Sequence, residues 1–112
     1  MSGKIRGPTL TDFVDELTLG SFFFNRAEKY KDQICQIDGI LDRSETYGGV
    51  KLRSVRVAMQ LQKRGVKSKD VVVFCSSNTL DNAIPIIGAT YLGARVANLE
   101  PSLSVRHVRH LL

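Results

Sequence analysis

Five consecutive apolar residues, Val71 to Cys75, constrain the fold more than any other feature of the chain. A run that is apolar at every position is typical of a β-strand that other parts of the protein cover on both faces. A helical pattern follows and stops at Gly93, and Arg95–Leu99 is the next strand-like segment. Strand, helix and strand with short connections predict a right-handed crossover and a parallel sheet, so the fold class is α/β.

A helix and a short hairpin are expected before this βαβ unit. Thr18 can cap a helix that runs to about Tyr30. Two short strands, Ile34–Asp38 and Ser44–Thr46, flank a turn-rich stretch and predict a hairpin with a loose loop. Residues 1–17 have only a short apolar pattern and are interpreted as an irregular N-terminal lead-in.

A long helix is predicted next, from an N-cap at Thr46 to Arg64, because apolar residues recur there at steps of three and four. Gly65 is placed to adopt the left-handed conformation that ends a helix, and Val66 can complete a Schellman motif.

Two further helices follow the apolar run. Asn78 or Thr79 is expected to cap the first, and Ser104 the second, which still runs at Leu112. The last helix enters a βαβ unit whose return strand is absent, and domain boundaries rarely fall at such a point. Truncation of a larger domain is therefore our first explanation.

The charge balance is basic, with 16 Lys and Arg against 11 Asp and Glu, a formal net charge of +5. The basic residues are scattered without a run of five, and the chain has no Trp to stack on bases. Solvated helix faces explain this pattern better than a nucleic-acid site does. Binding of RNA to the basic surface is kept as a weaker alternative, which a steep salt dependence of binding would reveal.

The sequence also predicts an intracellular protein that does not span a membrane. The most apolar long window, Ala83 to Leu99, is too short and too polar for a membrane helix. No secretory signal pattern stands at the N-terminus, and Cys35 and Cys75 lie in apolar runs, so both are expected to be buried reduced thiols. We expect a cytoplasmic or peroxisomal location, although the chain does not end in the peroxisomal tripeptide.

Seven short segments follow one another along the chain in a specific order and spacing: Tyr47–Val50, Arg53–Ala58, Gly65–Val66, Asp70–Val73, Asn78–Leu80, Pro85–Ala94 and Val96–Pro101. This colinear series resembles the adenylate-forming enzymes, the group of acyl-CoA synthetases, 4-coumarate–CoA ligases and beetle luciferases. The resemblance covers roughly Leu19 to Leu112.

The resemblance implies that residues 18–112 are a truncated N-terminal part of an AMP-dependent synthetase or ligase domain. Such enzymes join a carboxylic acid to ATP and pass the acyl-adenylate to coenzyme A, or to oxygen in luciferases. ATP, Mg²⁺ and coenzyme A are implied for a full-length relative, together with a carboxylic acid substrate. The phosphate loop and the C-terminal lobe of the family do not occur in this sequence, so no catalytic, cofactor-binding or metal-binding residue is assigned, and the fragment is expected to bind none of these cofactors.

Four features of the sequence are candidate sites on the strength of their residues alone. No Lys follows Gly88 and Gly93 as it would in a phosphate loop, so for these glycines close helix packing and a helix C-cap are favoured. For the polar loop after the apolar run, helix capping is favoured over contact with a ligand. For a pair of histidines near the C-terminus, a basic helix end is favoured over a metal site. Cys75 is expected to be an inert thiol. The loop is Ser76, Ser77 and Asn78, and the histidines are His107 and His110.

Besides the weaker RNA-binding alternative, two functions remain open at this point. The first is a non-catalytic N-terminal fragment of an acyl-CoA synthetase-like or luciferase-like enzyme. The second is a stand-alone α/β interaction module, which pairs through an exposed sheet edge with another chain such as a full-length relative.

Overall fold

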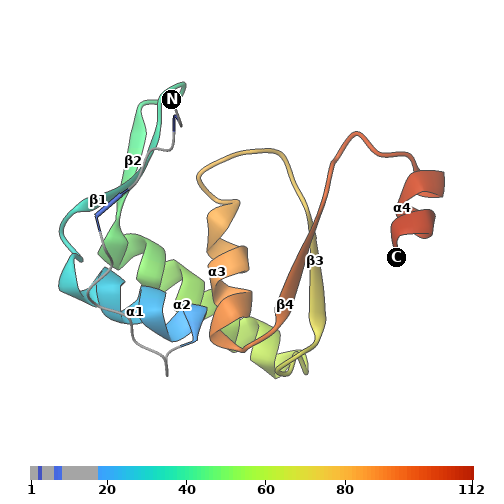
Figure 1. The fold of residues 1–112 in the computed structure, drawn as a ribbon, viewed down its shortest axis with the longest axis horizontal. Coiled ribbons are helices and arrows are strands. Elements are labelled where there is room, and N and C mark those ends of the chain that lie inside the picture. Colours follow the sequence, from blue (N-terminus) through green and yellow to red (C-terminus); the bar gives the residue numbers. More distant parts are fainter. Residues whose placement is uncertain (1–2, 4–6, 9–17) are drawn as a thin grey trace.

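The computed structural model describes residue 3, residues 7–8 and residues 18–112 (Figure 1). The predicted lead-in over residues 1–17 lies outside the described residues apart from these three. The chain carries four helices and four strands in its described part, in an order that mixes both types. The predicted α/β class is confirmed.

Helix α1 (Leu19–Lys29) leads into an antiparallel hairpin of β1 (Ile34–Asp38) and β2 (Arg43–Thr46). Thr18 caps α1 as predicted, because its hydroxyl accepts a hydrogen bond of 3.2 Å from the Ser21 backbone N–H. Both predicted strands of the hairpin are present, the second one residue longer than expected.

Helix α2 (Tyr47–Lys63) begins and ends as the sequence predicts. Thr46 is the N-cap and accepts from the Gly49 N–H at 3.1 Å. At the other end Gly65 has φ +91°, and the Val66 N–H donates to the Leu61 carbonyl at 3.1 Å. These contacts form the predicted Schellman motif.

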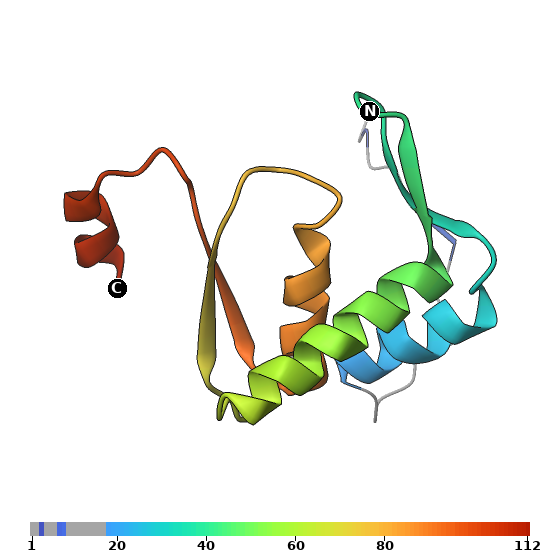
Figure 2. The same cartoon turned by 180° about the vertical axis from the view of Figure 1, so that it is seen from behind.

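The second half of the chain is a βαβ unit followed by a short helix: β3 (Val71–Cys75), α3 (Ala83–Tyr91), β4 (Arg95–Leu99) and α4 (Val105–Leu111). β3 and β4 are parallel, and their five residues pair in order from one end to the other. Ser104 caps α4, as predicted. Figures 1 and 2 show the hairpin and the β3–β4 pair on opposite sides of α3, with α4 standing apart.

The core lies where α1, α2 and α3 meet. Val50 and Ser54 of α2 are fully buried, and the Ser54 hydroxyl hydrogen-bonds with the Tyr91 hydroxyl at 3.1 Å. A Cβ at Gly88 would lie 2.9 Å from the Ser54 carbonyl oxygen, so only glycine permits this approach of α3 to α2. The predicted role of Gly88 in close helix packing is confirmed.

Two expectations about the βαβ unit are wrong. Exposure alternates along β3, with Val71, Val73 and Cys75 exposed, so the described residues cover one face of the strand instead of both. Asn78 and Thr79 do not cap α3, since that helix begins at Ala83, after a longer loop. None of the helices in the described part of the chain is long and apolar enough to cross a membrane.

Candidate functional site

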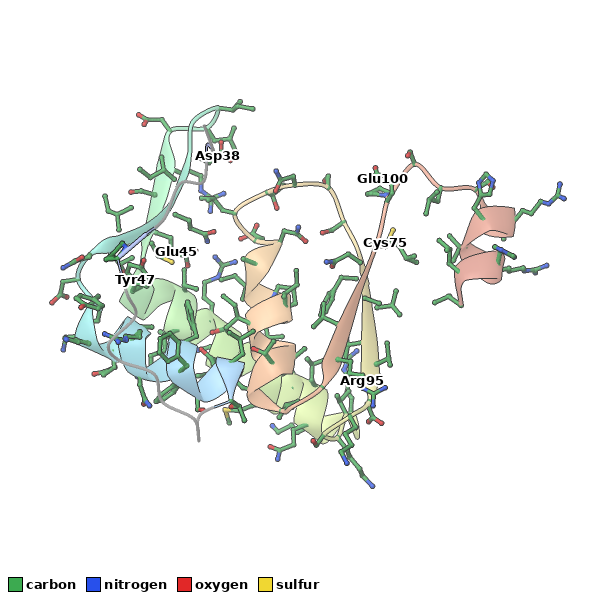
Figure 3. All side chains as sticks on the ribbon, in the orientation of Figure 1. Asp38, Glu45, Tyr47, Cys75, Arg95 and Glu100 are labelled. Atoms are coloured by element: carbon green, nitrogen blue, oxygen red, sulfur yellow. The ribbon has the colours of Figure 1, made fainter. Side chains whose placement is uncertain are left out.

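The carboxyl ends of β3 and β4 border a polar hollow of about 370 Å³. Because Cys75 pairs with Leu99, the two strands end at the same edge of the sheet, and Figure 3 shows Cys75 and Glu100 there, with Arg95 at the opposite end. Ligands of open α/β sheets bind beyond this edge. The hollow is lined by Phe74, Ser76, Asn82, Asn98, Leu99, Glu100 and Pro101.

The polar groups of this hollow are a hydroxyl, two amides and a carboxylate. The Ser76 hydroxyl donates to the Asn82 side-chain oxygen at 2.5 Å, so these two groups already satisfy each other. No Lys, Arg or His is among the lining residues, and the Glu100 carboxylate repels anions. A leaving pyrophosphate needs cationic or metal partners, so the described residues of this hollow do not fit a triphosphate.

The structure separates the three residues of the predicted polar loop. Ser76 lines the hollow at the sheet edge, whereas Asn78 lines a second hollow of about 350 Å³ between the hairpin and the loop before α3. Ser77 is exposed. The predicted preference for capping is wrong for Asn78, because the residue before α3 is Asn82 and its side chain makes no cap hydrogen bond.

The two histidines lie three residues apart on the exposed helix α4, as the sequence places them. His107 contacts its own N-cap, with 3.1 Å between its Nδ1 atom and the Ser104 hydroxyl. Within the described ranges no group of three or more His, Cys, Asp or Glu side chains is arranged to hold a metal ion. Gly93 has φ +71° and ends α3, which confirms its predicted role as a C-cap.

The two thiols differ in their surroundings. Cys75 is exposed, so the prediction that it is buried is wrong; it points to the uncovered side of β3, with Val71 and Val73. Cys35 is partly buried, and this burial raises its pKa, helped by the nearby Glu45 carboxylate.

Sequence reasoning missed a polar cluster centred on Arg53. Its Nη1 atom lies 3.0 Å from both carboxylate oxygens of Glu45, and its Nη2 atom donates to Asp81. Gln36 completes the cluster, because its amide nitrogen donates to Glu45 at 2.8 Å and to the Leu80 carbonyl at 3.0 Å. The two carboxylates raise the pKa of Arg53, Asp81 more than Glu45. Arg53 and Asp81 are 28 residues apart, and no periodicity in the sequence connects them.

Comparison with known proteins gives matches over most of the chain. Residues 23–112 match the family of AMP-binding enzymes. The 4-coumarate–CoA ligase 1 of Solanum tuberosum is 38% identical over 78 residues, which are 70% of this chain and 14% of the ligase. A 4-coumarate–CoA ligase of Pinus taeda is 36% identical over 87 residues, 78% of this chain and 16% of the ligase.

Solved structures match the fold as well. The luciferase-like enzyme of the nonluminescent mealworm Zophobas morio is 56% identical with a TM-score of 0.85, over 96% of this chain and 25% of that enzyme. A fatty acyl-CoA synthetase of Mycobacterium tuberculosis shares the fold at 22% identity, with a TM-score of 0.78 over 85% of this chain and 19% of the synthetase. The chain thus spans a quarter or less of the length of these relatives. It belongs to the family of AMP-binding enzymes.

Proposed function

We propose that this chain is the N-terminal part of an ATP-dependent acid–thiol ligase or luciferase-like enzyme, and that it contributes scaffold rather than reacting groups. The observation that carries this proposal is the polar hollow at the sheet edge. It has the position of a ligand site, yet its described lining offers a carboxylate and no cationic side chain. Charge neutralisation during adenylation must therefore come from groups outside this hollow.

The substrate in this proposal is a carboxylic acid. In the complete enzyme, ATP with Mg²⁺ activates the acid, and coenzyme A accepts the acyl group. The potato and pine relatives are named for 4-coumarate, and the bacterial one for fatty acyl groups. Because these names differ, we propose no narrower substrate class than carboxylic acids. We place the protein in the cytoplasm or the peroxisome, as expected from the sequence.

Two assays of acid-dependent pyrophosphate release test the proposal. The purified chain of 112 residues, given ATP, Mg²⁺, coenzyme A and either 4-coumarate or a fatty acid, should release no more pyrophosphate than a protein-free control. A chimaera in which the chain replaces the matching quarter of the mealworm enzyme should keep the activity that the mealworm enzyme shows with the same acids.

The two assays can fail separately. Release by the chain alone would overturn the scaffold role. A chimaera with the circular dichroism and melting temperature of the mealworm enzyme, but without its activity, would show that this chain does not support the site.

One observation favours the second candidate function, an interaction module. β3 and β4 form a two-stranded sheet in the described part of the chain, so each has an unpaired edge, and Val71 is 57% exposed beside it. Unpaired edges and apolar faces recruit other chains, including a full-length relative.

A further inference from the structure

The cluster around Arg53 joins two parts of the fold that are far apart in sequence. Glu45 belongs to β2 of the hairpin, Arg53 to α2, and Asp81 to the loop of residues 76–82 between β3 and α3. Figure 3 shows Glu45 at the base of the hairpin. The Glu45 side chain is only 15% exposed, and that of Arg53 is 37% exposed, so solvent screens the pair between them less than a fully exposed pair.

A second side chain makes the same connection. Gln36 of β1 donates one hydrogen bond to Glu45 within the hairpin and another to the Leu80 carbonyl in the loop. Within the described residues, no backbone hydrogen bond connects the loop to the hairpin. The loop's own backbone hydrogen bonds, such as that from the Asn82 N–H to the Thr79 carbonyl, stay inside the loop or enter α3. The hairpin and the β3–β4 pair are also separate sheets. Side chains alone hold the loop to the hairpin.

We propose that Arg53 is a latch that makes the hairpin and the loop of residues 76–82 open and close as one unit. One guanidinium holds both carboxylates at once, so its release removes a charged contact from both segments and leaves only the Gln36 hydrogen bonds between them. The loop starts at the carboxyl end of β3 and supplies Ser76 and Asn82 to the polar hollow, so the latch ties the hairpin to the edge where ligands of such sheets bind. This inference stands independently of the proposed function.

Native-state hydrogen exchange of the 112-residue chain, followed by NMR, tests the latch. Arg53→Met keeps an unbranched, flexible apolar side chain and removes both ion pairs. We expect it to raise exchange of the hydrogen-bonded amides of β1 and β2 and of the Asn82 amide in the loop by a common factor of about five to ten, the effect of losing two partly exposed charge pairs. The Ala94 amide, which donates to the Ala89 carbonyl at the end of α3, should keep its rate.

Arg56→Met is the matched control, because Arg56 is an exposed arginine of the same helix and forms no ion pair with the described residues. It should leave both regions unchanged. Asp81→Ala removes the Arg53 partner on the loop side only, and Asp81→Asn removes its charge while it keeps an oxygen acceptor. In both variants the loop should exchange faster than the hairpin, and the common rate should be lost.

Three results would overturn the latch. The first is a rise of the exchange rate in only one of the two regions of Arg53→Met. The second is an unchanged exchange rate in both regions of Arg53→Met. The third is an equal rise of the exchange rate in Arg56→Met. If Arg53→Met loses its dispersed NMR spectrum, Asp81→Ala decides alone, and an unchanged loop in that variant refutes the proposal.

Discussion

At the scale of single residues, the two thiols offer a direct comparison of environments. Burial and the Glu45 carboxylate raise the pKa of Cys35, which lowers its thiolate fraction at neutral and mildly alkaline pH. Cys75 lies exposed at the end of β3. We expect iodoacetamide to alkylate Cys75 severalfold faster than Cys35 in the folded chain, as measured by peptide mass spectrometry against time.

Raising the pH should narrow this difference, because more of the Cys35 thiol ionises as the pH approaches its raised pKa. Unfolding the chain in urea is the control, since it removes both the burial and the neighbouring carboxylate and should bring the two rates together. Equal rates in the folded protein would contradict the environments described here.

The strand that carries Cys75 shows which of its properties the sequence predicts and which it does not. Val71 to Cys75 are apolar at every position, which predicts the strand, and the strand is present. The pattern cannot tell whether a second layer covers both faces, because apolarity is a property of each side chain and coverage depends on distant segments. The exposure of Cys75 therefore could not be predicted from its neighbours.

At the scale of elements, α2 and α3 end in the same way, with a left-handed glycine and a Schellman pair of hydrogen bonds. Gly65 has φ +91° with nothing within 4 Å of an added Cβ, while Gly93 has φ +71° and an added Cβ would lie 2.9 Å from the Ser68 hydroxyl. Gly65→Ala should lower the free energy of unfolding by about 1 kcal/mol, the strain of a left-handed alanine. Gly93→Ala should cost slightly more, because the Ser68 hydroxyl must also rotate away from the added Cβ.

Urea unfolding followed by circular dichroism measures both costs. Ser68→Ala is the control background, since it removes the clashing hydroxyl and should bring the cost of Gly93→Ala toward that of Gly65→Ala. Equal costs for the two glycines in the wild-type background would show that the contact with Ser68 carries no energy.

The helix ends also separate what local sequence determines from what it does not. Thr18, Thr46 and Ser104 cap their helices as predicted, because a cap involves only the next three residues. Helix α3 begins about four residues later than the sequence predicts. The loop before it is held by Arg53 and Gln36, and such long-range contacts leave no signal in local spacing.

At the scale of the whole molecule, the chain is more extended than a compact domain of its length. Its radius of gyration is 16.8 Å, against about 13 Å for a compact domain of 112 residues. Short motifs in a fixed order were enough to predict the family, because they follow the chain. They could not predict the ligand chemistry, since the polar hollow joins side chains from the ends of β3 and β4 and from the segments that follow them.

The exposed face of β3 should make the isolated chain associate with itself. Val71 and Val73 are 57% and 37% exposed on a strand with an unpaired edge. Exposed apolar faces and unpaired strand edges favour association with another chain in water. Sedimentation velocity over a range of concentrations should detect dimers or larger species of the wild-type chain. Val73→Lys should shift them toward monomer, because a charge on this face opposes its burial.

Leu52→Lys is the matched control, since Leu52 is an apolar residue of α2 with 52% exposure and lies away from this strand. It should leave the association unchanged, which would locate the contact on β3 and favour the interaction module. A wild-type chain that stays monomeric at every concentration and melts in one cooperative step would argue against that module. The scaffold role would then stand alone, with the face of β3 covered only within the complete enzyme.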